Sequence, residues 1–291
     1  MHKNRNKPPA LSRRHLIQSS LSAILMGRTL LGKQTRFRLG ITDWNLYKTA
    51  DPDAIRLASQ LGFEGVQVSF GHDIQNGKMP LDDPAKIKQY LALSKQYKMP
   101  LDGTCVDRLH NNSLKSDKLA LQWVSDSIRL TKDLHTRVLP LPFFGHGALK
   151  TQAEMDYVGD ALRELAPQAE RANVILGLED TISAEDNVRI MDRSRSKNVL
   201  VYYDVGNSTI AGFDPVKEIR WLGKSRICQI HLKDNPHFLG EGSINFPAVL
   251  KAMRDIGFDG YANLETDARK DAVAEDLKRN LSYLRQLLAN S

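Results

Sequence analysis

Short apolar runs alternate with amphipathic stretches along the whole chain after residue 36. Each run is about five residues long, as expected of a buried strand, and the stretch after it has the apolar spacing of a helix. Eight runs are predicted to be strands: Phe37–Ile41, Gly65–Ser69, Leu101–Cys105, Arg137–Leu141, Val174–Leu178, Leu200–Tyr203, Ile227–Leu232 and Tyr261–Leu264. The stretches between them predict helices such as Asp53–Leu61, Asp83–Tyr97, Lys115–Leu134, Glu154–Arg171, Asp214–Leu222, Phe246–Ile256 and Asp271–Ala289.

This alternation favours one α/β domain. Asp82 with Pro84 and Asp214 with Pro215 supply caps and first-turn prolines at predicted helix starts. Short apolar strands alternating with helices are typical of a parallel sheet. Eight repeats within about 255 residues predict a (β/α)₈ TIM barrel rather than an open sheet. We therefore expect a single barrel over residues 36–291.

Four of the predicted late strands end in acidic or imidazole side chains. Glu179, Asp204, His231 and Glu265 are separated by 25, 27 and 34 residues, about one strand–helix unit each. In a barrel, side chains at the carboxyl ends of the strands converge on the active-site mouth. These four side chains are therefore predicted to face one another across it.

Three carboxylates that converge on one cavity repel each other, and a divalent cation would remove that repulsion. Oxygen ligands with a single imidazole suit Mn²⁺ best, with Mg²⁺, Co²⁺ and Zn²⁺ as alternatives. Taken singly, an acid after a strand is usually the cap of the next helix, and a histidine there is usually a core or rim residue. Four such residues on four consecutive strands favour a metal site.

With these residues in view, positions 36 to 291 resemble the xylose isomerase-like superfamily of sugar isomerases and epimerases. Glu179, Asp204, His231 and Glu265 match that family's metal ligands, one per strand. The stretches beginning at Asp204 (Asp-Val-Gly-Asn-Ser) and Ile230 (Ile-His-Leu-Lys-Asp), with the Gly-Glu-Gly turn at Gly240, are similar to its ketopentulose-phosphate 3-epimerase branch.

The resemblance implies a metal-dependent sugar or keto-sugar isomerase or epimerase. The reaction moves a hydrogen beside a carbonyl, and a metal that holds the substrate oxygens would stabilise the intervening enediolate. Glu179 and Glu265 would be the catalytic acid and base on opposite faces of the substrate, and both would also touch the metal. The expected partner is a small sugar. Relatives often pair, so a homo-oligomer is compatible with the resemblance.

Further residues follow the predicted strands and are candidates for contact with substrate. Trp44 and Phe144 could form an apolar wall, and Lys233 could either hold a substrate oxygen or pair with Asp234. The candidate substrate-binding residues are Trp44, His72, His110, His146, Asn207, Lys233 and Glu241.

Two positions depart from the family pattern and affect the expected substrate contacts. Many of its non-phosphorylated ketose epimerases have a histidine where this chain has Asn207, and strand two often ends in a glutamate where this chain has Gln67.

Composition and charge narrow the class of protein. The chain has 291 residues, of which 41% are hydrophobic and 26% charged, an ordinary globular composition. Its net charge of +7 invites a nucleic-acid partner, but residues 1–38 hold nine basic residues and no acid, and without them the charge is −2. We therefore expect no nucleic-acid partner. Two cysteines, Cys105 and Cys228, form no disulfide framework and are predicted to be core residues.

The basic segment has its own pattern. Paired arginines at Arg13-Arg14 precede a short apolar stretch from Leu21 to Leu31, which resembles a twin-arginine export signal. Residues 1–35 are therefore expected to be a leader that directs the protein to the periplasm, with a cytoplasmic protein as the alternative. The apolar stretch is too short for a membrane span, and no stable insertion into a membrane is expected.

Three other functions use the same fold. A keto-sugar or inosose-type dehydratase would share the metal and the base. A non-catalytic carbohydrate-binding barrel is the alternative from a different class, although it would have no reason to keep repelling carboxylates. An apurinic-site endonuclease is disfavoured, because Asn207 stands where that family needs a histidine.

Overall fold

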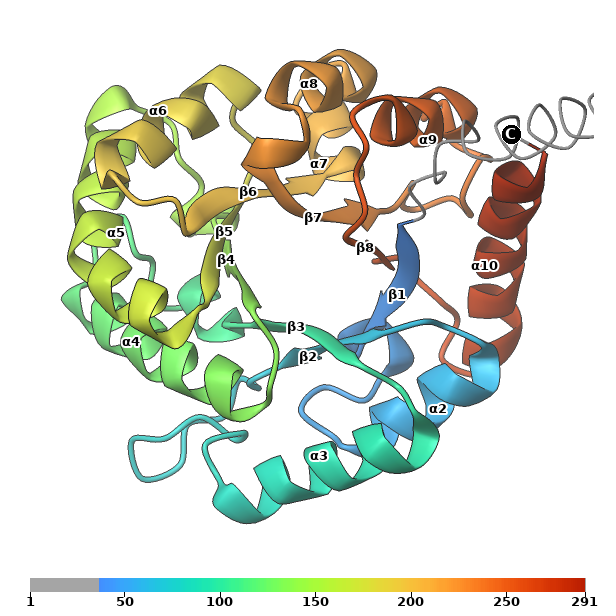
Figure 1. Cartoon of the computed structure of the whole chain (residues 1–291), viewed down its shortest axis with the longest axis horizontal. Helices are drawn as coiled ribbons and strands as arrows, with labels where there is room; N and C mark the ends of the chain where they lie inside the picture. Colours follow the sequence, from blue (N-terminus) through green and yellow to red (C-terminus); the bar gives the residue numbers. More distant parts are fainter. Residues whose placement is uncertain (1–36, 291) are drawn as a thin grey trace, which may run out of the picture. The chain divides into compact units, whose positions relative to one another are not determined.

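The computed structural model describes residues 37–290, and these form a ring of eight parallel strands (Figure 1). The strands are β1 Arg38–Thr42, β2 Val66–Ser69, β3 Leu101–Cys105, β4 Val138–Pro142, β5 Ile175–Glu179, β6 Val199–Asp204, β7 Ile227–Leu232 and β8 Tyr261–Leu264. Their order in the sheet is β3-β2-β1-β8-β7-β6-β5-β4. The first and last strands of the chain therefore pair, as in the predicted (β/α)₈ barrel, and that prediction is confirmed.

The ring closes between β3 and β4 without a regular ladder. The hydroxyl of Thr104 on β3 donates to the carbonyl oxygen of Val138 on β4 at 3.5 Å. The other seven neighbouring pairs are joined by parallel ladders, for example Gly40 with Asn263 and Asp204 with His231. The carboxyl ends of all eight strands consequently meet at one mouth.

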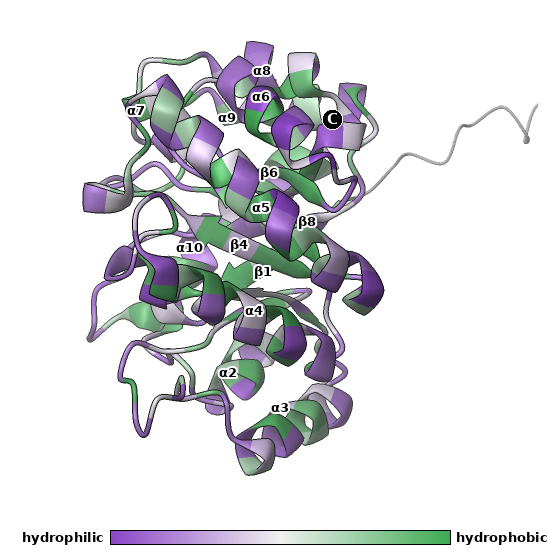
Figure 2. Cartoon of the chain, turned by 90° about the vertical axis from the view of Figure 1, so that its left-hand side faces the viewer, coloured by the Kyte–Doolittle hydropathy of each residue, from purple (hydrophilic) through white to green (hydrophobic). Residues whose placement is uncertain are grey.

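Helices surround the strands on the outside (Figure 1). The α-helices are α2 Asp53–Leu61, α3 Pro84–Tyr97, α4 Lys118–Asp133, α5 Gln152–Ala172, α6 Ala184–Ser194, α7 Val205–Ile210, α8 Pro215–Leu222, α9 Phe246–Asp255 and α10 Val273–Ala289. The buried residues of helices such as α2, α4 and α5 are mainly apolar. In Figure 2 the strands are coloured mainly as hydrophobic, while the helices carry both colours.

Side-chain caps fix several helix starts. The Asp83 carboxylate accepts from the Ala85 amide before α3, and the Asp214 carboxylate accepts from the Val216 amide before α8. At α5, Thr151 and Glu154 form a reciprocal capping box. These bonds satisfy amides that have no partner within their helix.

Strands β1, β4, β5 and β6 each end one residue later than predicted, and the unassigned helices follow β5 and β6. Strands β5 and β6 therefore reach Glu179 and Asp204, and helices α6 and α7 were not assigned bounds from the sequence. Helix α7 starts directly after β6 because the Asp204 carboxylate accepts from the Asn207 amide at 2.8 Å and caps it. No separate cap residue or loop marks this helix in the sequence.

The interior of the barrel holds a buried polar layer below the mouth. The Tyr202 hydroxyl lies between Gln67 and Asn263, and Asn263 donates to Asp102 at 3.1 Å. Gly40 borders this layer, and a Cβ atom there would lie 1.8 Å from the Asn263 side-chain oxygen. Only glycine therefore lets β1 approach the layer so closely.

The predicted leader, residues 1–35, lies outside the described residues. Within residues 37–290, no helix has the length and apolar content that crossing a membrane requires.

Candidate metal centre

Glu179, Asp204, His231 and Glu265 come together at the mouth, and we call them the strand-end cluster. Glu179 ends β5, Asp204 ends β6, His231 lies on β7, and Glu265 directly follows β8. One ligand atom from each lies within 4.8 Å of the others. Among the residues of the described barrel, this is the one group of potential metal ligands that converges in this way.

The imidazole of His231 lies at the centre of the cluster. Its Nδ1 atom is 2.9 Å from Oε1 of Glu179, 3.5 Å from Oε2 of Glu265 and 3.7 Å from Oδ2 of Asp204. The ammonium of Lys233 lies 2.7 Å from Asp204 Oδ2 and 2.6 Å from Glu265 Oε2. Lys233 therefore pairs with two cluster carboxylates and not with Asp234, which accepts from the amides of the Gly240–Gly242 turn instead.

The three carboxylates make the cluster strongly attractive to positive charge. Burial opposes protonation of His231, but Glu265 and Glu179 outweigh it and raise the pKa of the imidazole to about 10. Burial likewise opposes the charge on Lys233, yet Asp204 and Glu265 raise its pKa above the ordinary value. Burial favours the neutral form of Asp204, but the charges of Lys233 and His231 lower its pKa well below the usual range.

Glu265 differs from the other cluster carboxylates. Its side chain is 19% exposed, against 4% for Glu179 and 0% for Asp204. Burial raises the pKa of Glu265, and the opposing charges of His231 and Lys233 offset this only in part. Its Oε1 atom accepts from the indole N–H of Trp44 at 3.1 Å. Glu265 is therefore an oriented carboxyl group that reaches the cavity and takes up a proton more readily than usual.

The donor set fits a divalent cation. With His231 neutral, three carboxylates against the single ammonium of Lys233 leave two negative charges uncompensated. Without a cation, the imidazole is drawn into holding a proton among the carboxylates. An ion of charge +2 would balance the cluster, and three oxygen donors with one imidazole suit Mn²⁺, Mg²⁺ or Co²⁺.

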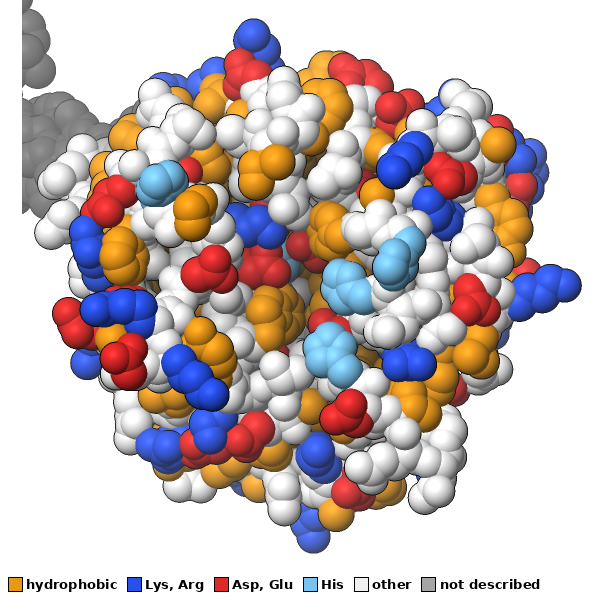
Figure 3. Space-filling view, turned by 180° about the vertical axis from the view of Figure 1, so that it is seen from behind, with side chains coloured by type: hydrophobic (Ala, Val, Ile, Leu, Met, Phe, Trp, Pro, Cys, Tyr) orange, Lys and Arg blue, Asp and Glu red, His pale blue; other side chains and the backbone are white. Residues whose placement is uncertain are grey.

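A cavity of about 480 Å³ opens above the cluster, and we call it the mouth cavity. In Figure 3 this face is hollowed at its centre, where acidic side chains gather with imidazole rings at the edge. The cavity is lined by Trp44, His72, Cys105, Asp107, His110, Pro142, Phe144, Glu179, Asn207, Lys233 and Glu265. Its walls combine apolar and aromatic faces with a few convergent polar groups, as small-molecule sites do.

Most of the candidate substrate-binding residues line this cavity, and two do not. Trp44, His72, His110, Asn207 and Lys233 lie in its wall, and the His110 ring stacks on Phe144 with 6.1 Å between ring centroids. His146 is an exposed residue of the short 3₁₀ helix Gly145–Gly147 and is not part of the lining. Glu241 also lies outside the lining and pairs with Arg279.

The sequence analysis missed Asp107 and assigned Cys105 only to the core. Cys105 is buried but lines the cavity, and Asp107 lies two residues beyond the end of β3. The Asp107 carboxylate accepts a hydrogen bond from the Ser69 hydroxyl. Burial and the charge of Asp107 raise the pKa of Asp43, the residue that follows β1. The sequence signal was a polar residue shortly after an apolar run, which is the pattern that identified the strand-end cluster.

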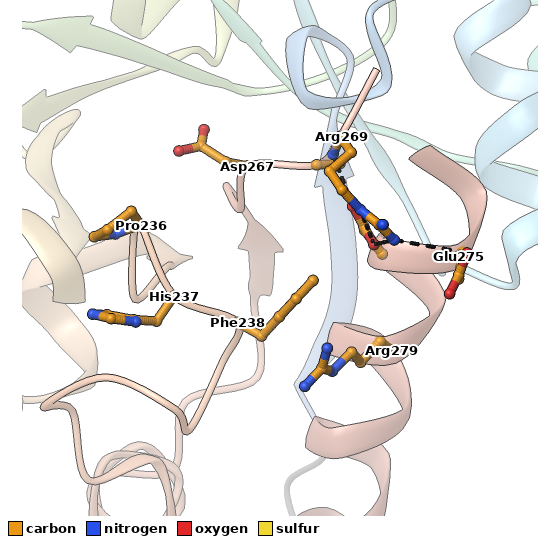
Figure 4. A pocket seen from close by; sticks show the side chains of 9 residues that line it. Pro236, His237, Phe238, Asp267, Arg269, Glu275 and Arg279 are labelled. Atoms are coloured by element: carbon orange, nitrogen blue, oxygen red, sulfur yellow. Dashed lines mark hydrogen bonds and ion pairs between the residues drawn. The ribbon is translucent and has the colours of Figure 1, made fainter. Parts of the chain in front are cut away.

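A second, more open cavity of about 570 Å³ lies between the loops after β7 and β8 (Figure 4). Its two arginines are already paired: Arg269 binds Asp276 at 2.7 Å, and Arg279 pairs with Glu241 while lying over the Phe238 ring. This cavity contains none of the strand-end cluster residues. The chemistry-bearing groups therefore belong to the mouth cavity.

Comparison with known proteins places these observations in a family. A family model described as xylose isomerase-like TIM barrel matches residues 55–287. A curated relative, 2-epi-5-epi-valiolone 7-phosphate 2-epimerase from Actinoplanes sp., is 24% identical over 261 residues, which cover 87% of this chain and 96% of the relative. L-ribulose 3-epimerase from Mesorhizobium japonicum is 25% identical over 181 residues, covering 58% of this chain and 60% of the relative.

Solved structures share the fold. The structure of D-psicose 3-epimerase with D-tagatose from Clostridium cellulolyticum H10 superposes with a TM-score of 0.73 at 17% sequence identity. The superposition covers 87% of this chain and 99% of that one. At this level of identity, the likeness establishes a common barrel and not a common substrate.

Proposed function

The chain belongs to the xylose isomerase-like TIM barrel family, and on that premise we propose that it is a divalent-metal-dependent epimerase or isomerase of a small sugar or keto-sugar. The observation that carries the proposal is the strand-end cluster, in which two glutamates from different strands border one cavity and converge with a buried aspartate and a buried histidine. Its curated relatives with named activities are epimerases, which supports the same reaction class.

The two glutamates supply the acid and the base. Glu179 comes from β5 and Glu265 from the end of β8, and both carboxylates line the mouth cavity. A carboxylate on one face of the substrate takes the hydrogen beside the carbonyl as a proton, and the electron pair moves onto the carbonyl oxygen. A carboxyl group on the other face returns a proton to the same carbon, which inverts that centre.

Neighbouring residues prepare these groups for proton transfer. The Trp44 indole holds Glu265 by its Oε1 atom, and the Lys233 ammonium holds the Oε2 atom. Burial raises the pKa of Glu265 toward the working range of an acid–base group. Because Lys233 also lines the cavity, its ammonium can donate a hydrogen bond to a substrate oxygen that gains negative charge.

The four residues of the strand-end cluster would hold the ion. When bound, a divalent cation supplies positive charge that stabilises negative charge on substrate oxygens. Trp44, Phe144 and Pro142 provide an apolar wall that excludes water and orients the sugar ring.

We further propose an uncharged sugar as the substrate. Among the residues that line the mouth cavity, Lys233 is the one permanently charged cation, and Asp204 and Glu265 already bind it. Asp107 adds a carboxylate to the opposite wall. A phosphate group would find no unpaired lysine or arginine there, whereas hydroxyl groups can bond to Asp107, Asn207 and the histidines. Export through the Arg13-Arg14 signal, which we propose from the sequence alone, agrees with an extracytoplasmic free sugar.

Hydrogen exchange with solvent tests the function. The protein loaded with Mn²⁺ is incubated in D₂O with a panel of free ketoses, keto-sugars and their phosphate esters, and deuterium incorporation beside the carbonyl is measured by NMR. We expect exchange into an uncharged substrate and its loss when the metal is removed with a chelator. A protein that binds no divalent metal and catalyses no exchange would instead be a non-catalytic carbohydrate-binding barrel.

Substitution of the catalytic pair sharpens the test. E265Q and E179Q should each lower exchange by at least about a hundredfold, because removal of a general acid or base costs roughly that much. Mn²⁺ affinity is measured calorimetrically in parallel, so that loss of proton transfer is distinguished from loss of the ion. The control is E164Q, a change at an exposed position of α5 that should leave exchange unchanged. Full exchange in metal-loaded E265Q would remove Glu265 from its role.

A further inference from the structure

The two ring nitrogens of His231 have different partners. Nδ1 faces the three carboxylates of the strand-end cluster, with Glu179 nearest at 2.9 Å. Nε2 points the opposite way and lies 2.8 Å from Oε1 of Gln67 on β2. Both side chains are fully buried. Because a neutral imidazole carries one hydrogen, the nitrogen that holds it leaves the other free to bind a cation.

The Gln67 carbonyl oxygen is held in place as an acceptor. The Tyr202 hydroxyl donates to it at 3.1 Å and in turn accepts from the Asn263 amide at 3.1 Å. The single hydroxyl hydrogen of Tyr202 is therefore directed to Gln67. An oxygen that already accepts from Tyr202 can only accept from His231 as well, so the hydrogen of the neutral imidazole belongs on Nε2.

The surrounding side chains keep the Gln67 amide from flipping its oxygen and nitrogen. The Tyr202 ring lies edge-on against the imidazole, with 4.5 Å between ring centroids. Asn263 is anchored at its other amide hydrogen by Asp102, at 3.1 Å. Hydrogen bonds therefore run across the barrel from Asp102 to His231 and determine the orientation of the Gln67 amide.

We propose that Gln67 is a positioning residue that keeps the hydrogen of His231 on Nε2 and thereby presents the Nδ1 lone pair to a divalent ion in the strand-end cluster. The inference rests on the proposed metal-dependent function. In proteins, a metal-binding histidine usually donates its second N–H to a carboxylate, a backbone carbonyl or water. Here the acceptor is the side-chain amide oxygen of Gln67, from the opposite side of the barrel. Gln67 does not line the mouth cavity, so its place in the structure is that of a support beneath the ion and not of a substrate contact.

Metal affinity measured by calorimetry tests the role. Metal-free wild-type protein, Q67M and Q67E are titrated with Mn²⁺. Methionine has a similar length but cannot accept the N–H in the same way, so Q67M should bind about tenfold to a hundredfold more weakly. Q67E keeps an acceptor oxygen and should bind within about threefold of the wild type or more tightly.

A matched control separates this effect from damage to the core. Gln229 is another buried glutamine of the barrel interior, and its amide donates to the Asp102 carbonyl oxygen at 2.7 Å. Q229M therefore removes a buried amide without touching the Nε2 bond of His231, and it should leave Mn²⁺ affinity unchanged even where the melting temperature falls. Equal losses of affinity in Q67M and Q229M would overturn the proposal.

The hydrogen itself can be observed in protein loaded with diamagnetic Zn²⁺. With ¹⁵N-labelled histidine, the His231 ring should show an Nε2–H correlation protected from exchange in the wild type and in Q67E, and should lose that protection in Q67M. A hydrogen on Nδ1 in the loaded wild type would overturn the proposal.

Failure of the proposed function and failure of the role of Gln67 give different results. If the wild type binds no divalent ion, the proposed function fails, whereas unchanged affinity in Q67M refutes only the role of Gln67. If Q67M does not fold, Y202F takes its place, since it keeps the ring and removes the hydroxyl that holds the amide. Y202F should weaken Mn²⁺ binding at least about threefold, and unchanged affinity would count against the proposal.

Discussion

Lys233 places a permanent cation within the ligand set of the proposed ion. Its ammonium binds Asp204 and Glu265, while its aliphatic stem lies against Gly206 at the start of α7. A Cβ atom at Gly206 would be 2.5 Å from the Lys233 Cγ atom, so the glycine makes room for the lysine. The lysine reduces the charge of the cluster to one that a single divalent ion neutralises.

Removing this ammonium should strengthen metal binding and weaken catalysis. K233M leaves the carboxylates without an internal counter-ion and removes a charge that repels the metal. We expect Mn²⁺ affinity to rise about tenfold, which corresponds to a screened repulsion of about 1.4 kcal/mol. Hydrogen exchange into substrate should fall, because the substrate oxygen loses a charged donor. Titration calorimetry and the exchange assay measure the two effects.

The control for this prediction is K251M. Lys251 lies on the exposed side of α9, where it pairs with Asp255, and its substitution should change neither quantity. Weaker Mn²⁺ binding in K233M would mean that Lys233 orders the carboxylates more than it repels the ion.

At the scale of elements, the capping box of α5 gives a stability prediction. The Thr151 hydroxyl accepts from the Glu154 amide at 3.2 Å, and the Glu154 carboxylate accepts from the Thr151 amide at 3.0 Å. T151A removes the first bond and should lower the free energy of unfolding by about 1 kcal/mol. For a domain of this size, that corresponds to a fall in melting temperature of about 2–4 °C.

T151S provides the comparison, because serine keeps the hydroxyl. It should melt close to the wild type in a calorimetric scan. If T151A and T151S melt at the same temperature, the capping hydroxyl contributes nothing to stability.

Much of the fold could be predicted because the signals for strands and helix starts lie within a few neighbouring residues. Strand β3 and helix α2 have the predicted bounds, since apolar runs and first-turn caps are visible within a few residues. The start of helix α7 could not be predicted in this way, because its cap, Asp204, is also a member of the strand-end cluster. Its carboxylate bonds with one oxygen to the helix and with the other to Lys233.

The same reasoning applies to the site. The strand-end cluster could be predicted, because each member lies where an apolar run turns polar. The bond between His231 and Gln67 could not, since it joins positions 164 residues apart inside the barrel. Whether Glu241 would reach the mouth also could not be predicted, because its pairing with Arg279 depends on how α10 packs.

At the scale of the whole molecule, the buried polar layer links stability to pH through Asp102. Burial raises the pKa of Asp102 to about 8, although the Asn263 hydrogen bond opposes the shift. In the unfolded chain this carboxyl ionises near pH 4. Between these values the folded protein holds one proton more than the unfolded chain, so this group makes stability fall as pH rises from about 4 to about 8.

D102N should remove this dependence. Asparagine has nearly the same shape and does not ionise, so the difference in melting temperature between pH 5 and pH 8 should be smaller than in the wild type. Other titrating groups are common to both proteins, and the comparison of the two slopes isolates Asp102. Parallel curves would show that Asp102 ionises normally in the folded barrel.

The residues that line the mouth cavity are divided between the two halves of the chain. All four cluster residues come from β5 to β8, whereas Trp44, His72, Asp107 and Phe144 follow β1 to β4 and line the same cavity. Trp44, Gln67 and Asp102 of the early half bond to Glu265, His231 and Asn263 of the late half, whereas His72 and Phe144 can change without removing a bond to the strand-end cluster. Under the proposed function, substitutions at His72 and Phe144 would therefore alter which sugar is accepted, while the reaction type would be kept as long as the late half and its three bonded partners persist.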